Sequence, residues 1–391
     1  MHTGYVKSGK FTIGSKVTCS FDELRRHPIR NNHTGTHILN FGLREVLGDD
    51  VNQKGSLVAP EKLRFDFSHK AAVSTAELQK IEDLCTSYIH QNSEVYAKDV
   101  SLASAREING VRAVFGETYP DPVRVVSVGV PVDDLLADPK KPDWRAVSVE
   151  FCGGTHVTST DEIKELVVLE ESGIAKGVRR IIAVTGQAAH DAQRVADAFD
   201  AQLKQLEAMQ NGPARDQRNK DLNARYAELD ASALRKASFK DRLGKVGKDI
   251  VDAQKTLQKA ENKKVVDMIA QHFASHPDSG AFVAAVSFEL GSGSKAVPEA
   301  IKHVQSKMKE KTVYLIGAVP SDGKVMHGCH VAEGAAKAGA SASEWANKVA
   351  GAVGGKAGGK GATSVGNGTK VEGVEEGVRV AAEYLAGLGV Q

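Results

Sequence analysis

Two short segments of the sequence carry side chains that often bind metal ions. His33 and His37 are four residues apart, and Cys152 and His156 have the same spacing. On a helix, this spacing places two side chains on one face, with Cβ atoms about 5–6 Å apart. Three imidazoles and one thiolate can complete a tetrahedral zinc shell. The two pairs therefore predict a contact between distant parts of the chain and a Zn²⁺ site with the ligands His33, His37, Cys152 and His156.

The residues between the first two histidines argue against protease chemistry. Zinc proteases of the His-Glu-x-x-His type use the glutamate as a base. This chain has Thr34, Gly35 and Thr36 at the intervening positions, so that base is absent. A shell of four protein ligands is also closed, which favours a structural metal unless one ligand is loosely held.

The segments around both motifs predict a mixture of strands and helices over residues 1–190. Asn31 and Asn32 are suitable caps for a helix that carries the histidine pair. A β-branched strand at 146–151 runs into Cys152, so the second motif is expected on a strand-to-helix turn. We expect further strands at 11–19, 55–58, 63–67, 123–130, 166–170 and 179–184, and a helix at 75–97.

The later part of the sequence changes character twice. Between 188 and 268 glycine is rare and alanine, lysine and leucine are common, which predicts long helices broken near 211–213. Apolar runs at 281–286 and 312–319, with a helix at 294–309 between them, predict a parallel βαβ unit. We expect a strand at 324–331, a helix from 343, a Gly/Lys loop at 354–361 and a last helix at 373–386.

These elements predict an α/β protein of three domains. The first, at 1–190, is an α+β domain that contains the four candidate ligands. A helical arm or coiled-coil linker follows at 191–275, and a small α/β domain occupies 276–391.

The composition is that of an ordinary globular protein, with 41% hydrophobic and 26% charged residues. Because the net charge is only +2, nucleic-acid binding would depend on local basic patches. No apolar run approaches the roughly 20 residues of a membrane helix, so we expect no membrane partner. The four scattered cysteines favour a reducing, cytoplasmic compartment. We expect Cys19, Cys85 and Cys329 to be buried.

Several motifs together resemble one protein family. Residues 32–37, 53–58 and 63–67 look like the editing domain of alanyl-tRNA synthetases, and 149–156 and 177–181 match the same domain in order and spacing. The stretch around 342–345, with the Gly/Lys loop, resembles the C-terminal domain of these enzymes in their eukaryotic cytosolic form. The helical middle of the chain is similar to the arm that joins these domains.

The resemblance implies an ester hydrolase. Editing domains of this family deacylate tRNA(Ala) that carries serine or glycine, because these amino acids differ too little from alanine for one pocket to reject them. The resemblance also implies that the four candidate ligands hold Zn²⁺. We expect Gln53, Thr36 and Cys152 to act in catalysis and Thr34 to contact the substrate. For both threonines, helix capping or packing is an equally good interpretation.

Further residues are candidates for contact with tRNA(Ala). Arg179 and Arg180 form a basic cluster, and Lys356 and Lys360 lie in the Gly/Lys loop, where backbone N–H groups can also bind phosphate. A solvated surface is the plainer interpretation of each cluster. Asp66 is a candidate for the substrate site together with Arg64. A buried salt bridge of Asp66 with Arg64 or Arg179 is an equally good interpretation.

Two other functions stay open at this point. The chain could be a non-catalytic tRNA-binding or assembly module with a structural zinc, or a metal-dependent hydrolase of another ester. Nothing in the sequence resembles an aminoacylation domain, so we expect the C-terminal part of a synthetase or a freestanding editing protein. The strand expected at 11–19 favours the first. A homodimer formed through the C-terminal domain is also expected from the resemblance.

Overall fold

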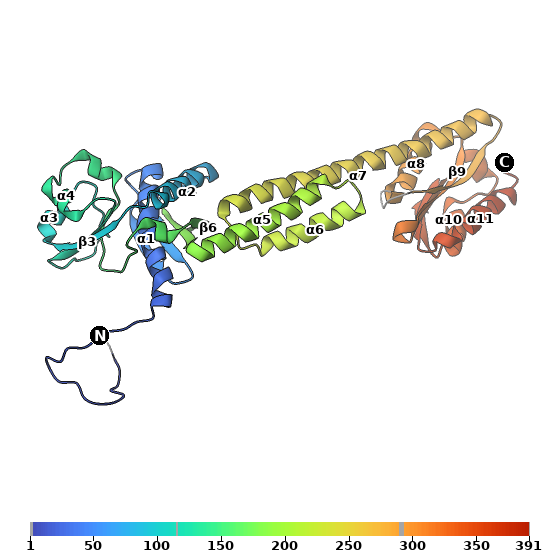
Figure 1. Cartoon of the computed structure of the whole chain (residues 1–391). Helices are drawn as coiled ribbons and strands as arrows, with labels where there is room; N and C mark the ends of the chain where they lie inside the picture. Colours follow the sequence, from blue (N-terminus) through green and yellow to red (C-terminus); the bar gives the residue numbers. More distant parts are fainter. Residues whose placement is uncertain (1–2, 115, 289–292, 391) are drawn as a thin grey trace. The chain divides into compact units, whose positions relative to one another are not determined.

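The computed structural model describes residues 3–114, 116–288 and 293–390. These residues form two compact units. The first comprises residues up to Gln210 together with Gln217–Gly244, and the second comprises Asn211–Asp216 and the chain from Lys245 onward (Figure 1). Helices and strands are mixed in both, which confirms the α/β fold class. The division into three domains stays a prediction.

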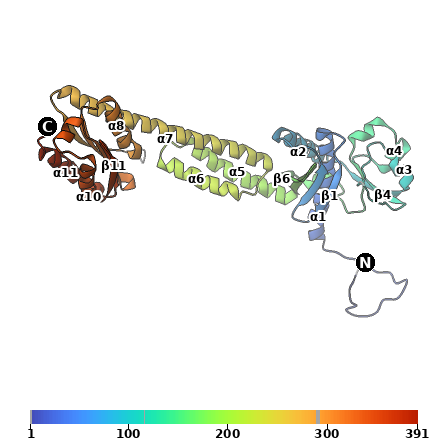
Figure 2. The same ribbon diagram turned by 180° about the vertical axis from the view of Figure 1, so that it is seen from behind.

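The first unit is built around a four-stranded antiparallel sheet with the order β1-β2-β7-β6. Helices α1 and α2 pack together against this sheet (Figure 2), and their apolar side chains share one core with Phe65 and Phe67. The predicted hairpin of β1 and β2 is confirmed. The bounds are α1 Glu23–Leu47, β1 Gln53–Val58, β2 Leu63–Ser68, α2 Thr75–His90, β6 Leu166–Ala175 and β7 Val178–Thr185.

A three-stranded antiparallel sheet with the order β3-β4-β5 completes the folded part around the candidate ligands. Val125 and Phe151 lie opposite one another on β4 and β5 and pack into a separate core. The bounds are β3 Val95–Val100, α3 Leu102–Arg106, β4 Val123–Val128, α4 Val132–Ala137, β5 Val149–Phe151 and the 3₁₀ turns Pro142–Ala146 and Thr160–Ile163.

Helix α1 begins earlier than the sequence indicated. Asp22, not Asn31 or Asn32, is its N-cap, and its carboxylate accepts a hydrogen bond from the backbone of Arg25. The Asn32 side chain instead donates to the carbonyl of Ala59 and accepts from the Thr185 hydroxyl. The predicted caps are therefore wrong: both residues lie inside the helix, and the Asn32 amide connects it to the sheet instead of starting it.

Helix α2 ends earlier than predicted. A capping box of Ser74 and Glu77 starts it, but the helix stops at His90, and the expected helical residues from Val95 onward form strand β3. Pairing with β4 along its whole length outweighs the helical pattern, because local propensity yields to tertiary pairing.

The strand expected at 11–19 is not present. Residues 3–22 contain no strand in the described structure, and Phe11 and Ile13 are exposed. An alternating pattern forms a strand only when a neighbouring strand supplies hydrogen bonds, and none pairs with this segment. Cys19 is exposed as well, so its predicted burial is wrong, whereas Cys85 and Cys329 are buried as expected.

The helices predicted for the middle of the chain are confirmed, with a break where Gly212 precedes Pro213. They are α5 Gly186–Ala208, α6 Pro213–Ala227 and α7 Ala233–Ser275. Within the first unit, Phe199 of α5 contacts the rings of Tyr226 and Phe239. Helix α5 is therefore packed on both of its helical neighbours.

The second unit has a five-stranded sheet with the order β11-β12-β10-β9-β8. Strands β8 and β9 are parallel, with α8 between them in the chain, which confirms the predicted βαβ unit. Trp345 lies fully buried in its core, and its indole donates to the carbonyl of Ala381. The bounds are β8 Ala281–Ser287, α8 Gly293–Lys307, β9 Thr312–Val319, β10 Lys324–His330, α9 Glu333–Lys337, α10 Ala342–Ala352, β11 Gly355–Lys360, β12 Thr363–Gly368 and α11 Val374–Ala386, with 3₁₀ turns at Pro320–Asp322 and Val371–Gly373.

The Gly/Lys loop is an edge strand. Strand β11 pairs with β12 from Gly355 to Lys360. A Cβ added at Gly355 or Gly359 would overlap backbone atoms of β12, so glycine permits this close approach of the two strands. The prediction of a loop is wrong, because these glycines allow two strands to lie close together and do not form a turn.

No helix among the described residues is both long and apolar enough to cross a membrane.

Candidate metal centre

The structure brings the four candidate ligands together. One donor atom from each of His33, His37, Cys152 and His156 lies within 4.8 Å of the others. Atoms bound about 2.0–2.3 Å from one tetrahedral ion lie about 3.3–3.8 Å apart. The Sγ atom of Cys152 and Nε2 of His33 are 3.3 Å apart, so the cluster is already close to such an arrangement.

Two different local structures present these side chains. His33 and His37 lie one turn apart on α1, as predicted. Cys152 and His156 lie in an irregular loop after β5, so their expected position on a strand-to-helix turn is wrong. A Cβ at Gly154 would overlap the His33 ring. The glycine of the Cys-Gly-Gly-Thr-His motif therefore lets this loop close over the helix.

The outer ring nitrogens are held by hydrogen bonds. Nδ1 of His33 lies 3.2 Å from the carbonyl oxygen of Thr155, and Nδ1 of His156 lies 3.1 Å from Oγ1 of Thr34. The Thr34 oxygen also accepts from the backbone N–H of Val157. Partners of this kind fix the tautomer and leave Nε2 available to a metal.

The Nε2 atom of His156 gives independent support for metal binding. This atom is buried and has no hydrogen-bond partner among the described residues. Unpaired buried polar atoms are costly, and a metal ion at the centre of the cluster would satisfy this one. The donor set of three imidazoles and one thiol therefore fits a tightly bound metal ion.

Burial sets the protonation of the cluster. It is the main cause that lowers the pKa of His37 well below its ordinary value and that of His156 to about 3. Burial also lowers the pKa of His33 and raises that of the Cys152 thiol. Neutral imidazoles are the form that binds a metal, and a bound cation would in turn favour the thiolate.

A pocket of about 260 Å³ opens beside the cluster. Two of the predicted catalytic residues besides Cys152 line it: Gln53 donates to the Ser56 hydroxyl, and the Thr36 hydroxyl donates to the carbonyl of Asn32. Thr34 does not line this pocket, because its hydroxyl is engaged with His156.

Other side chains that line the pocket were not identified from the sequence, among them Asn40, Arg112 and Glu150. Asn40 donates to Oε1 of Glu150 at 2.7 Å, while Oε2 of Glu150 lies 3.7 Å from Nε2 of His37. Burial raises the pKa of Glu150 to about 7. The period of two along β5 places Glu150 on the same side as Cys152, a signal that could have found it. Arg112 carries no such signal.

The predicted basic and acidic residues of the sheet form ion pairs outside this pocket. Asp66 accepts two hydrogen bonds from Arg180, at 2.7 and 2.8 Å, and lies 3.5 Å from Arg64. Arg179 pairs with Glu171. The interpretation of a salt bridge between Asp66 and Arg64 is therefore confirmed, and the one with Arg179 is wrong.

The two predicted phosphate-binding lysines belong to the second unit. Lys356 and Lys360 are both exposed on the edge strand β11. Each residue pairs with β12 through the backbone. A ligand at this edge would therefore contact the lysine side chains and not a free loop of N–H groups.

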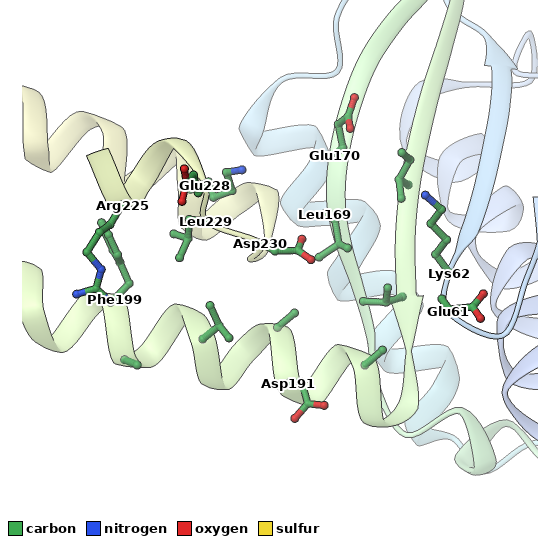
Figure 3. A pocket seen from close by; sticks show the side chains of 17 residues that line it. Glu61, Lys62, Leu169, Glu170, Asp191, Phe199, Arg225, Glu228, Leu229 and Asp230 are labelled. Carbon is green, nitrogen blue, oxygen red and sulfur yellow. The ribbon is translucent and has the colours of Figure 1, made fainter. Parts of the chain in front are cut away.

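A larger groove of about 1200 Å³ lies elsewhere in the first unit. Figure 3 shows Phe199 and Leu229 on one side and Leu169 on a strand opposite, with Glu228 and Asp230 near them. None of the four candidate ligands lines it. Cavity size alone therefore does not locate the chemistry of this protein.

Three family models match successive parts of the chain. The model described as "Threonyl and Alanyl tRNA synthetase second additional domain" matches residues 123–182. The model described as "Alanine--tRNA ligase domain" matches 189–253, and the "DHHA1 domain" matches 278–387. Their order corresponds to one family. The chain matches the C-terminal region of alanine–tRNA ligases.

Relatives named alanine–tRNA ligase align along most of the chain. The protein from Candida albicans is 51% identical over 87% of this chain and 35% of its own length. The mitochondrial enzyme from Saccharomyces cerevisiae is 48% identical over 86% of this chain and 34% of its own length. The cytoplasmic enzyme from Drosophila melanogaster is 35% identical over 98% of this chain and 40% of its own length.

The chain thus spans a third to two fifths of the length of these alanine–tRNA ligases. A solved structure, the C-Ala domain of alanyl-tRNA synthetase from Aquifex aeolicus, overlaps with 27% of this chain and 89% of its own, at 15% identity and a TM-score of 0.23. An overlap at that level supports no conclusion about the fold.

Proposed function

We propose that this chain hydrolyses the ester bond of seryl- or glycyl-tRNA(Ala), as the proofreading part of an alanine–tRNA ligase. The observation that carries the proposal is the cluster of His33, His37, Cys152 and His156 beside a polar pocket. The family match to a second additional domain of threonyl and alanyl tRNA synthetases supports it.

Zn²⁺ is the metal that this donor set favours, because thiolate and imidazole ligands in a tetrahedral shell are typical of zinc sites. His33, His37, Cys152 and His156 would hold it. A bound Zn²⁺ supplies Lewis-acid chemistry at an ester carbonyl.

The side chains of the pocket can recognise and orient the substrate. The Thr36 hydroxyl uses its hydrogen on the Asn32 carbonyl and keeps lone pairs that can accept from the hydroxyl of a seryl group. The Gln53 amide can turn from Ser56 toward the ester. A site that hydrogen-bonds a substrate hydroxyl discriminates strongly against a substrate without one, which would favour the seryl ester over alanyl-tRNA. This hydrogen bond accounts for the seryl ester and not for the glycyl ester, which has no hydroxyl.

The experiment is a deacylation assay with seryl-tRNA(Ala) and alanyl-tRNA(Ala). We expect rapid loss of the seryl ester only, and we expect Cys152→Ala to abolish it. Cys19→Ala is the matched control, because Cys19 is free and exposed. Stable seryl-tRNA(Ala) in the presence of zinc-loaded protein would refute the proposal.

A second candidate is a non-catalytic tRNA-binding or assembly module with a structural zinc. One observation favours it: all four ligands come from the protein, and such shells are usually closed. This candidate predicts bound zinc and bound tRNA without hydrolysis in the same assay.

We further propose that Lys356 and Lys360 contact the backbone of tRNA(Ala). We also propose that the enzyme is cytoplasmic and forms a homodimer through residues 276–391. Replacing both lysines with alanine should weaken filter binding and reduce the slope of log K against log salt by roughly 0.7–0.9 per lost phosphate contact. Lys337→Ala is the control, since Lys337 is exposed and pairs with Glu333. Equal slopes would remove both lysines from the contact surface. Sedimentation of the full chain tests the dimer.

A further inference from the structure

One cation in the wall of the metal pocket has no role in the proposal so far. Arg112 lines the pocket next to the loop of Cys152. Its backbone is fixed to strand β5 on both sides, because its N–H donates to the carbonyl of Val149 at 2.8 Å and its carbonyl accepts from the N–H of Phe151 at 2.9 Å. The backbone of Arg112 is therefore positioned by the strand that leads to Cys152.

The guanidinium of Arg112 is poorly paired. The side chain is 24% exposed, and its closest ion-pair partner is Asp49, with 3.7 Å between NH2 and Oδ1. Asp49 makes a much closer contact with Arg145. Within the described parts of the chain, the guanidinium of Arg112 donates no hydrogen bond, and Asp49 at 3.7 Å is its nearest carboxylate. Five N–H donors are thus held at the pocket without an acceptor.

The surroundings favour an anion at this point. Burial and then the neighbouring charge of Arg44 lower the pKa of Arg112, and the charges of Glu150 and Glu45 offset only part of this effect. Glu150 also lines the pocket, but its carboxylate is directed to Asn40 and His37. A bound anion would satisfy donors that the protein leaves unpaired.

We propose that Arg112 binds a phosphodiester near the 3′ end of the acylated RNA and so positions the ester in the metal pocket. This inference rests on the proposed function. A pocket of about 260 Å³ is smaller than the roughly 300–1,000 Å³ of typical ligand sites, so it takes the aminoacyl end and leaves the adjoining nucleotides outside. Arginine matches phosphate through two parallel hydrogen bonds.

The test compares two substrates that differ in their phosphates. Arg112→Gln should raise KM for seryl-tRNA(Ala) about 10- to 100-fold, the range expected when a hydrogen bond to a charged group is lost, and should change kcat by less than about threefold. Turnover of 2′(3′)-O-seryl-adenosine, which has no phosphodiester, should not change. Arg112→Lys should recover part of the loss, because it retains the charge but not the paired donors.

A binding measurement keeps the two proposals separable. We would measure the affinity of the full chain for a seryl-tRNA(Ala) analogue with an amide in place of the ester, at several salt concentrations. Arg112→Gln should weaken binding and reduce the salt slope by roughly 0.7. Arg106→Ala is the control, because Arg106 is an exposed arginine outside the pocket.

The outcomes that overturn the inference are distinct from those that overturn the hydrolase. Equal losses on seryl-tRNA(Ala) and seryl-adenosine would mean that Arg112 acts on the ester itself. Unchanged affinity and salt slope would mean that it contacts no phosphate. A lower melting temperature or zinc content as the sole change would assign it a structural role. If the wild-type chain hydrolyses neither substrate, the hydrolase proposal fails, and the binding measurement still decides the role of Arg112.

Discussion

Thr34 joins the two halves of the metal centre. Its oxygen lies 3.1 Å from Nδ1 of His156 and accepts from the N–H of Val157 at 3.2 Å. Thr34→Val keeps the shape of the side chain but removes the oxygen that makes both contacts, so the orientation of His156 is lost. We expect zinc affinity to fall about 10-fold or more, as for other hydrogen bonds that orient a metal ligand.

Competition with a chromophoric chelator measures this change. Thr34→Ser is the matched control, because it retains the hydroxyl and should bind zinc like the wild type. Equal affinities of the valine and serine variants would show that the hydroxyl does not orient His156.

Glu82 should make the stability of the protein depend on pH. It is half-buried on α2 and accepts from the backbone N–H of Val168 at 2.7 Å. Burial is the main cause that raises its pKa from an ordinary value of 4.5 to about 7. The folded state therefore disfavours the carboxylate, so this group costs nothing below about pH 4.5, and its cost grows as the pH rises through 7.

Glu82→Gln keeps the acceptor for Val168 and removes the charge. Its free energy of unfolding should exceed that of the wild type by about 2 kcal/mol at pH 8 and match it near pH 4.5. Urea unfolding at a series of pH values measures the difference. Parallel pH profiles for the two proteins would show that Glu82 is not the source.

At the scale of elements, strand β11 offers a matched pair of glycines. A Cβ at Gly359 would overlap the carbonyl of Thr363 on β12, whereas one at Gly358 meets nothing within 4 Å. Gly359→Ala should therefore destabilise the protein by about 1–3 kcal/mol, the usual cost of inserting a methyl group into a packed site. Gly358→Ala should be close to neutral.

Hydrogen exchange of the amides of β12, together with thermal unfolding, distinguishes the two glycine variants. Loss of protection in both, or in neither, would contradict the close approach of β11 and β12.

Several elements and the metal cluster could be predicted from the sequence because their signals are local. The helical spacing of His33 and His37, the long apolar runs of β8 and β9 and the helix break at Pro213 each depend on nearby residues. The start of α1 could not be predicted from the sequence, because Asn32 is suited to capping but makes a tertiary hydrogen bond with Thr185. Strand β11 could not be predicted either, because it forms only by pairing with β12.

The pocket beside the cluster was only partly predictable. Gln53 and Thr36 came from resemblance to a family, and both line the pocket. Asn40 lies on α1 three residues after His37, so helical spacing could have indicated it, whereas Arg112 reaches the pocket only through the fold. Residues that serve a site from separate elements leave no pattern of spacing in a single sequence.

At the scale of the whole molecule, the metal belongs to one of the two compact units. Metal removal should lower the melting temperature of the first unit by about 5–10 °C and leave the second unchanged. A ligand at 100 times its Kd stabilises by about 2.7 kcal/mol, and each kcal/mol shifts a unit of this size by about 2–4 °C.

Calorimetry of the full chain with zinc and with a chelator measures the two transitions. Trp144→Phe leaves Trp345, which is buried in the second unit, as the single tryptophan, so its fluorescence assigns that transition. His156→Ala is the control that should not respond to the chelator. A shift of the Trp345 transition by the same amount would show that the two units unfold together.

The separation of the ligands along the chain has a consequence for synthesis. His33 and Cys152 are 119 positions apart, and a ribosome adds about 5–20 residues per second. His33 therefore leaves the ribosome roughly 6–24 seconds before Cys152, and His156 completes the candidate set four residues later. During that interval the nascent chain holds only two of the four candidate ligands, His33 and His37. Binding of a metal ion by all four side chains would therefore begin only after His156 is made, while residues 157–210 and 217–244 of the same unit are still to be synthesised.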